Sequence, residues 1–190
     1  MDLGVTERLR PLLDAAQTFI DERVQPVDKE FLAEVGKGDR WSLTARQHEI
    51  LDDLKSAARE QNLWNFWLTD SESGYGLTTV EYAYLAEATG RSHLAAEAFN
   101  CSAPDTGNME VLERYGTEEQ KKQWLEPLLN GEIRSAYAMS EPDVASSDAT
   151  NISMSAVLEN GEWVINGEKT YISGAGDERC KIMICMVKTN

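Results

Sequence analysis

The sequence predicts an α+β protein, in which an N-terminal all-α helical bundle domain is followed by the start of an antiparallel β-barrel or sheet domain. Through the first two-thirds of the chain, apolar residues recur every three to four positions, the period of a helix packed on one face. After residue 131, apolar and polar residues alternate over short segments, as they do in strands. Two Asn-Gly pairs, Asn160-Gly161 and Asn166-Gly167, are typical of hairpin turns. We therefore expect a helical domain at residues 1–132 and the first part of a β domain at residues 133–190.

Threonine caps are expected at the start of three helices, and a proline or a glycine at the end of two. Thr6 is a candidate N-cap of the first helix, and Pro26 is expected to end it because proline has no amide hydrogen to donate. The acidic stretch at residues 27–38 is therefore expected to be irregular. Thr44 is expected to cap the next helix, and the apolar segment NLWNFWL to pack in the core. The remaining helices are expected at residues 79–88, 94–99, 104–115 and 117–131, the last with a capping box at Thr117 and a C-cap at Gly131.

Strands are expected at residues 134–140, within the alternating segment 151–173, and at residues 180–187. An antiparallel sheet of so few strands leaves hydrogen-bonding edges open unless further strands cover them. We therefore expect the β domain to continue past Asn190, so that the chain is a fragment.

The composition excludes several classes of function. Lys and Arg number 18 against 33 Asp and Glu, a formal net charge of −15, so we expect no nucleic acid partner and no insertion into an anionic membrane. No apolar run is long enough to span a bilayer, and the start of the chain has no signal-peptide pattern. Three cysteines and two histidines at scattered positions indicate reduced thiols and no metal site. We expect a soluble intracellular protein.

The segment YAMSEPDVASSD, Tyr137 to Asp148, is the candidate binding loop. It begins like a buried strand and turns polar at Ser140-Glu141-Pro142. Backbone amides and serine hydroxyls can bind a phosphate or the polar edge of a heterocycle without a lysine, which suits so acidic a chain. Taken alone, these residues favour an ordinary Ser/Asp-rich turn.

Two motifs together resemble the acyl-CoA dehydrogenase family. Its signature has a Ser/Thr-Glu-Pro stretch, a small-residue loop ending in Ser-Asp, and then an Asn-Gly-x-Lys motif. The corresponding residues here are Ser140-Glu141-Pro142, Ser147-Asp148 and Asn166-Gly167-Glu168-Lys169. The segments 99–112 and 141–152 resemble the branch related to human members ten and eleven, in which this part can be attached to a kinase-like part.

The resemblance implies a fold and a reaction. The fold has a helical N-terminal domain, a β middle domain and a C-terminal four-helix domain, and the last is missing from this chain. FAD lies between the middle and C-terminal domains. The enzyme oxidises the α,β bond of an acyl-CoA in fatty acid β-oxidation, by removing the α-proton and transferring the β-hydride to flavin N5. The resemblance also implies electron-transfer flavoprotein as the electron acceptor, and a homodimer or homotetramer.

The resemblance assigns FAD-binding roles to seven residues. Those expected to line or face the flavin ring are Tyr137, Met139, Ser140, Tyr171 and Ser173, the last by a hydrogen bond near N5 or O4. Ser146 and Ser147 are expected at the pyrophosphate, with Ser147 also near the acyl-CoA. The loop has one residue more than the family's usual loop, which leaves open which of the two serines takes which place. Tyr171 stands where the family usually has tryptophan.

No catalytic residue is expected in this chain, because the family's catalytic base is a carboxylate of the C-terminal domain. Glu141 is expected to be a structural acceptor, and the chain by itself to be inactive. Two alternatives remain: a non-catalytic helical assembly module with the same fold, and a related flavin oxidase or hydroxylase. The hydroxyls of Ser140, Ser147 and Ser173 argue against the module, which has no chemical need of them. Nothing in the sequence excludes the oxidase or hydroxylase.

Overall fold

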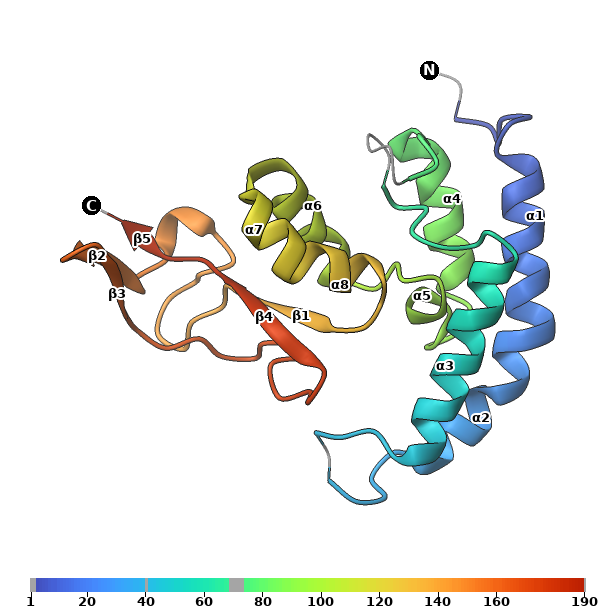
Figure 1. The fold of residues 1–190 in the computed structure, drawn as a ribbon, viewed down its shortest axis with the longest axis horizontal. Coiled ribbons are helices and arrows are strands. Elements are labelled where there is room, and N and C mark those ends of the chain that lie inside the picture. Colours follow the sequence, from blue (N-terminus) through green and yellow to red (C-terminus); the bar gives the residue numbers. More distant parts are fainter. Residues whose placement is uncertain (1–2, 40, 69–73, 190) are drawn as a thin grey trace. The chain divides into compact units, whose positions relative to one another are not determined.

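Figure 1 shows the computed structural model, which describes residues 3–39, 41–68 and 74–189. The chain divides into two compact units, Met1–Thr106 and Gly107–Asn190. The described part of the first unit is helical, whereas the second combines helices with strands. This arrangement confirms the predicted α+β class. No helix within the described residues is long and apolar enough to cross a membrane.

The first unit is built from α-helices and one π-helical turn. In order they are α1 (Arg10–Phe19), the π-helical η1 (Ile20–Val24), α2 (Gln25–Glu34), α3 (Ala45–Glu60), α4 (Thr79–Thr89) and α5 (Ala95–Ala98). Because α1, η1 and α2 follow one another without a break, the prediction that Pro26 ends the first helix is wrong. The prediction of an irregular stretch from residue 27 is wrong as well, since α2 continues to Glu34.

A π turn before each proline explains how these helices continue. In η1 the Gln25 amide donates to the Ile20 carbonyl, and Pro26 follows in the first turn of α2. Proline cannot donate to the preceding turn, and its ring clashes with the carbonyl four residues back in a regular helix. The extra residue of the π turn changes the hydrogen-bond spacing before the proline. The helix can therefore continue without an amide from the proline and without the clash. The second unit repeats the arrangement at Pro127, which follows the π turn η2.

Threonine capping boxes start three of the helices. In α3, Thr44 accepts the amide of Gln47 through its hydroxyl, and the Gln47 side chain accepts the amide of Thr44. Thr78 caps α4 in the same way, and Thr117 caps the first helix after α6. The predicted caps at Thr44 and Thr117 are therefore confirmed, each satisfying amides that have no partner inside the helix.

The core of the first unit is built around three phenylalanines. Phe99 packs against Phe19 and Phe66, with ring centroids 5.3 Å and 5.1 Å apart. The segment NLWNFWL supplies buried residues to this core, as predicted: Leu63, Phe66, Trp67 and Leu68. Asn65 and Asn100 both adopt a left-handed backbone, which asparagine tolerates better than most residues. The Asn100 side-chain amide donates to the Asn65 side-chain oxygen at 2.7 Å, which joins the two buried turns.

Ion pairs with a buried partner link separate segments of the first unit. Lys55 of α3 lies 3.0 Å from Glu97 of α5, and the two side chains are only 10% and 14% exposed. Within the described residues, Lys55 has no other hydrogen-bond or ion-pair partner. Near the start of α4, Glu81 accepts hydrogen bonds from Arg8 and from the Thr6 hydroxyl. Thr6 also accepts the amide of Leu9, so it caps the turn that leads into α1 and not α1 itself.

The second unit places strands beside short helices (Figure 1). Its elements are α6 (Asp105–Tyr115), α7 (Glu118–Gln120), η2 (Lys121–Leu125), α8 (Glu126–Leu129), β1 (Arg134–Ala138), η3 (Ala149–Asn151), β2 (Ser155–Glu159), β3 (Glu162–Asn166), β4 (Cys180–Cys185) and β5 (Lys188–Thr189). Within the described residues, β1 pairs with β4 and β2 with β5 in parallel, and β2 and β3 are the only strands that pair antiparallel. The expected antiparallel pairing therefore holds for the hairpin alone.

One of the two Asn-Gly pairs forms a hairpin turn. Asn160 and Gly161 both have positive φ angles, 54° and 86°, which is the conformation a two-residue turn between twisted strands requires. Asn166-Gly167 does not turn a hairpin, and that prediction is wrong: β3 ends at Asn166 and no strand occurs among residues 167–179.

A buried amide attaches α6 to β1. The Asn108 side-chain nitrogen donates to the Ser135 hydroxyl at 2.9 Å and to the Ala136 carbonyl at 3.0 Å. The last α-helix of the described residues ends at Leu129 and the first strand begins at Arg134, so the change from α-helix to strand occurs where the sequence predicts it. The division into domains at residues 1–132 and 133–190 stays a prediction.

We expect Glu97→Leu to lower the free energy of unfolding by about 3 kcal/mol, because it leaves the Lys55 ammonium buried without its partner. The double variant Lys55→Met/Glu97→Leu should recover most of this loss, since it removes both charges. Urea unfolding followed by far-ultraviolet circular dichroism measures both values. A double variant as unstable as Glu97→Leu would contradict the assignment of the cost to the unpaired lysine.

The Glu81 carboxylate should make stability depend on pH. Hydrogen bonds from Arg8 first, and then from Thr6, lower the pKa of Glu81 from 4.5 to about 2. A carboxyl with a lowered pKa stabilises the fold above its unfolded pKa and loses that contribution as pH falls through its folded pKa. The advantage of the native chain over Glu81→Gln should therefore shrink between pH 4.5 and about pH 2.

Thermal unfolding of both proteins across this pH range measures that advantage. Glu49→Gln is the control for loss of a surface carboxylate, because the Glu49 side chain is 63% exposed. A Glu81→Gln deficit that stays constant down to the low end of the range would count against the prediction.

Candidate functional site

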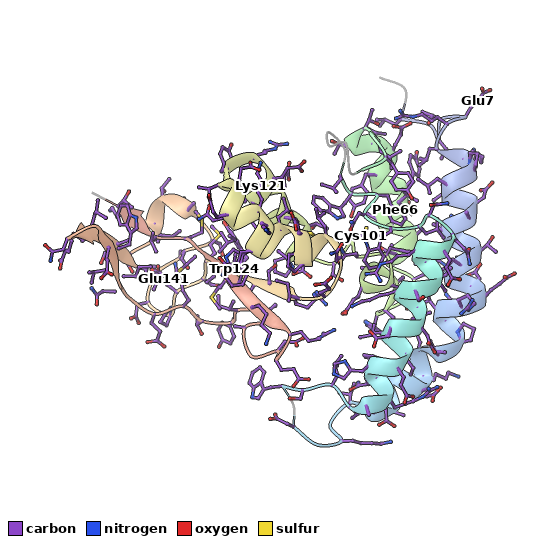
Figure 2. All side chains as sticks on the ribbon, in the orientation of Figure 1. Glu7, Phe66, Cys101, Lys121, Trp124 and Glu141 are labelled. Atoms are coloured by element: carbon purple, nitrogen blue, oxygen red, sulfur yellow. The ribbon has the colours of Figure 1, made fainter. Side chains whose placement is uncertain are left out.

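The loop after β1 is organised around the buried side chain of Glu141 (Figure 2), which is only 3% exposed. One carboxylate oxygen accepts the Met154 amide at 2.9 Å, and the other accepts the amide and the hydroxyl of Ser153 at 2.9 Å and 2.5 Å. Lys169 donates to the first oxygen at 2.8 Å. One carboxylate therefore joins the loop to the start of β2 and to the segment after β3.

Lys169 holds the same junction from the other side. Its ammonium, on a side chain 7% exposed, also donates to the Met139 carbonyl at 3.0 Å. The amide of Thr170, the residue that follows Lys169, donates to the Ser140 carbonyl at 2.9 Å. The Ser-Glu-Pro and Asn-Gly-Glu-Lys motifs, far apart in the sequence, therefore lie side by side in the fold.

The environment of Glu141 keeps it ionised. The hydrogen bond from Lys169, followed by that from Ser153, lowers the pKa of Glu141 to about 2. A carboxylate that is ionised at neutral pH, and whose oxygens are occupied by protein donors, is a poor proton acceptor for a substrate. Glu141 is therefore a structural acceptor, as the sequence predicts.

Gly167 allows the close approach of two segments in this junction. Its φ angle of 149° is one that side-chain-bearing residues rarely adopt. A Cβ at this position would lie 2.6 Å from the Met154 Cγ and 2.9 Å from the Met154 Cα. No side chain fits there, so Met154 can reach Glu141 only because residue 167 is glycine.

The two candidate pyrophosphate serines lie in different environments. Ser146 is buried, and its hydroxyl accepts the Glu141 amide at 2.6 Å. Ser147 is exposed, and its hydroxyl has no hydrogen-bond partner within the described chain. Ser146 therefore shapes the loop from inside, and Ser147 is the serine that presents its hydroxyl outward.

The candidate flavin-facing residues lie on the two segments that Glu141 and Lys169 join. Tyr137 is 37% exposed, Met139 and Ser140 are half-buried, and Ser173 is exposed. Tyr171 is 94% exposed and has a φ angle of 54°, an uncommon conformation for a bulky residue. The hydroxyls of the tyrosines and serines in this set have no hydrogen-bond partner among the residues that the structure describes.

These side chains fit a flavin nucleotide. Free hydroxyls can donate to the carbonyl edge of the ring and to a pyrophosphate, and an outward tyrosine can cover the face of a planar heterocycle. Non-glycine residues with strained backbone are concentrated at functional sites, so the conformation of Tyr171 is consistent with a ligand there. The described residues contain no group of three or more His, Cys, Asp or Glu that could hold a metal ion.

Two residues of this junction were missed by sequence reasoning. Lys169 belongs to the family motif, but the sequence indicates no role for it, because a lysine in an alternating segment ordinarily faces solvent. Ser153 lies just before β2 and has no pattern that marks it. Only the folded chain brings either residue to Glu141.

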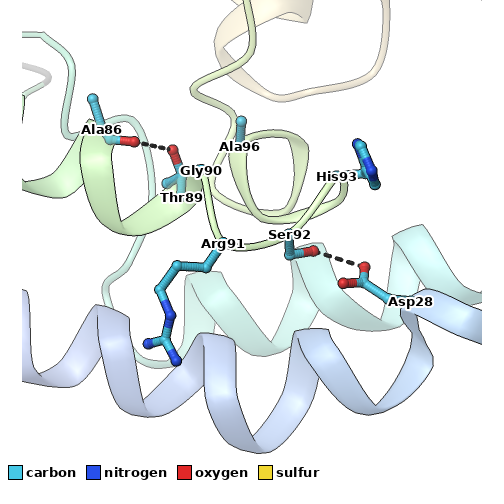
Figure 3. A pocket seen from close by; sticks show the side chains of 8 residues that line it. All are labelled: Asp28, Ala86, Thr89, Gly90, Arg91, Ser92, His93 and Ala96. Atoms are coloured by element: carbon cyan, nitrogen blue, oxygen red, sulfur yellow. Dashed lines mark hydrogen bonds between the residues drawn. The ribbon is translucent and has the colours of Figure 1, made fainter.

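The first unit contains a separate pocket of about 340 Å³, shown in Figure 3. It lies at the end of α4, between Thr89 and His93, with Asp28 on its wall. Two hydroxyls that line the pocket are already hydrogen-bonded within the protein. Ser92 donates to the Asp28 carboxylate at 2.7 Å, and Thr89 donates to the Ala86 carbonyl at 2.8 Å. None of the predicted site residues lines it, so this pocket is not the candidate site.

Comparison with protein families gives two matches that follow one another along the chain. Residues 6–132 match the N-terminal domain of acyl-CoA dehydrogenases, and residues 136–190 match their middle domain. The chain is 50% identical over 192 aligned residues to acyl-CoA dehydrogenase family member 10 of Mus musculus, covering 98% of this chain and 18% of that protein. It is 45% identical over 188 residues to family member 11 of Homo sapiens, covering 97% of this chain and 23% of that protein.

A solved structure agrees with these matches. A putative acyl-CoA dehydrogenase from Mycobacterium abscessus superposes with a TM-score of 0.89 at 49% identity, covering 98% of this chain and 47% of that one. The chain thus spans about a fifth of the two curated relatives and about half of the solved relative. The predicted resemblance to the branch of members ten and eleven is confirmed, and the chain belongs to the acyl-CoA dehydrogenase family.

Proposed function

We propose that this chain is the N-terminal and partial middle portion of an FAD-dependent acyl-CoA dehydrogenase. The observation that carries the proposal is the set of outward, unpartnered side chains on the two segments joined at Glu141 and Lys169, with Tyr171 exposed at 94% in a strained conformation. Among proteins that share this fold, the acyl-CoA dehydrogenase of Bacillus anthracis was solved as a complex with FAD, with a TM-score of 0.64 at 24% identity.

The proposed FAD site divides into a ring part and a pyrophosphate part. Tyr137, Met139 and Ser140 line the ring from the end of β1, while Tyr171 covers it and Ser173 donates to its polar edge. Ser147 donates to the pyrophosphate and lies near the acyl-CoA. Ser146 keeps the loop in shape from its buried position. When bound, FAD supplies the hydride acceptor for oxidation of the acyl α,β bond.

No residue of this chain is assigned the catalytic base. Glu141 lies next to the proposed ring site, but its carboxylate is occupied by Ser153, Met154 and Lys169. Proton abstraction requires a base within hydrogen-bond reach of the α-carbon. We therefore assign the base to a part of the protein outside these 190 residues.

The partners follow from the same proposal. The reduced flavin passes its electrons to electron-transfer flavoprotein, and the full-length protein is a homodimer or homotetramer. One solved neighbour, the electron transferring flavoprotein of Acidaminococcus fermentans, shares the fold with a TM-score of 0.55 at 23% identity. The proposed location is cytoplasmic in a bacterium, and mitochondrial or peroxisomal in a eukaryote.

Ser147→Ala in the full-length protein should weaken FAD binding by about 1–3 kcal/mol, because the pyrophosphate loses one hydrogen-bond donor. Titration of the apoprotein with FAD, followed by flavin fluorescence, measures the change. Ser56→Ala, at another exposed serine on α3, is the matched control and should leave the affinity unchanged. Equal affinities of Ser147→Ala and the native protein would reduce the loop to an ordinary turn.

Residues 1–190 alone should have no acyl-CoA dehydrogenase activity, because the base is absent and a flavin at Tyr171 would remain open to water. Apolar side chains on one face of the hairpin, Leu158, Trp163 and Ile165, are also 48–58% exposed and should promote self-association. The assay combines the purified chain with FAD, a series of acyl-CoAs and an artificial electron acceptor. Dye reduction above a control without protein would overturn the assignment of the base to the missing part.

A further inference from the structure

The proposed flavin-facing residues all lie close in sequence to the buried Glu141–Lys169 pair. Ser140 precedes Glu141 directly, while Tyr171 and Ser173 follow Lys169 by two and four residues. The Lys169 ammonium bonds to both the Glu141 carboxylate and the Met139 carbonyl. The pair therefore fixes the distance between the two segments that form the proposed ring site.

Tyr171 depends on this junction most directly. A left-handed backbone at a bulky residue persists only where its surroundings impose it. The side chain of Tyr171 makes no hydrogen bond within the described residues and is 94% exposed, so its own contacts do not impose the conformation. The constraint comes from its neighbours in the chain. Before it, Thr170 is bonded to the Ser140 carbonyl and Lys169 is bonded at both acceptors. After it, the Ala175 amide donates to the Ile172 carbonyl.

We infer that Glu141 and Lys169 are positioning residues for the flavin, which place the Tyr171 side chain against the ring without touching the cofactor themselves. The inference rests on the proposed function. A buried ion pair suits this role, because either charge alone would be left without compensation in a dry site. The two segments are therefore held in one arrangement, and a slipped arrangement would separate the charges.

The test is a double-mutant cycle in the full-length protein, using Lys169→Met, Tyr171→Ala and both together. The dissociation constant of FAD is measured by flavin fluorescence, and the environment of the bound ring by visible circular dichroism. Lys169→Met should weaken FAD binding about tenfold and change the spectrum of the flavin that still binds. In the Tyr171→Ala background, most of this loss and of the spectral change should disappear, because the residue that Lys169 positions is already absent.

A matched control separates positioning from general stability. Arg179 and Asp177 form another ion pair of the same unit, at 2.7 Å with side chains 18% and 24% exposed. Arg179→Met should lower thermal stability while leaving the FAD affinity and the flavin spectrum unchanged. Lys169→Arg, which keeps the charge, should restore part of the affinity that Lys169→Met loses.

The outcomes separate this inference from the function on which it rests. If the native full-length protein does not bind FAD, the proposed function fails. If the native protein binds FAD, but Lys169→Met and Tyr171→Ala act additively within about twofold, the positioning role is overturned and the proposed function stands. Should Lys169→Met not fold, the same cycle is run with Glu141→Gln/Lys169→Met, which leaves no buried unpaired charge.

Discussion

The buried pair of Glu141 and Lys169 is the interaction on which the β part of this protein depends. Taking two charges out of water is costly, and the cost is offset only when the charges lie close together and further hydrogen bonds reach both groups. Here the carboxylate receives two backbone amides, a hydroxyl and an ammonium, while the ammonium also reaches a backbone carbonyl. These partners come from three separate segments, so the two charges find their partners only when those segments are assembled.

This dependence explains why the two sequence motifs occur as a pair. The Ser-Glu-Pro loop provides the acceptor, and the Asn-Gly-Glu-Lys segment provides the donor. Gly167 gives the second motif its close approach to Met154, where any side chain would collide with the main chain. The first role of the two motifs is therefore structural, because they hold the two segments together. Half-buried Ser140 and exposed Tyr171 lie on either side of this junction and belong to the proposed ligand site.

The proposed function requires a strongly acidic chain to bind a dinucleotide without help from the electrostatic field of its net charge. With a net charge of −15, the protein repels a pyrophosphate at long range. The candidate site offers exposed hydroxyls instead, because the lysine of its motif is bound in an internal ion pair. Affinity in such a site has to come from short-range donors and from stacking, both of which require the loop to be positioned in advance.

The sequence by itself determined the features that depend on neighbouring residues. The capping boxes at Thr44 and Thr117, the hairpin turn at Asn160-Gly161 and the change from helix to strand after Leu129 all follow from local chemistry. The family could also be read from short motifs, and with it the candidate site residues. The prediction that Pro26 ends the first helix was wrong because a π turn before Pro26 needs no amide from the proline. No sequence pattern indicates where a π turn forms.

Only the tertiary structure decided the features that join distant segments. The parallel pairing of β1 with β4 brings together residues more than forty positions apart, and no local pattern distinguishes parallel from antiparallel partners in short strands. The sequence likewise could not predict that Ser146 is buried and Ser147 exposed, because the two serines are adjacent and chemically identical. The hydrogen bond from the Glu141 amide to the Ser146 hydroxyl distinguishes them. Lys169 became visible as a buried partner only once the fold had placed it beside Glu141, because burial is a property of the assembled chain and not of any one residue.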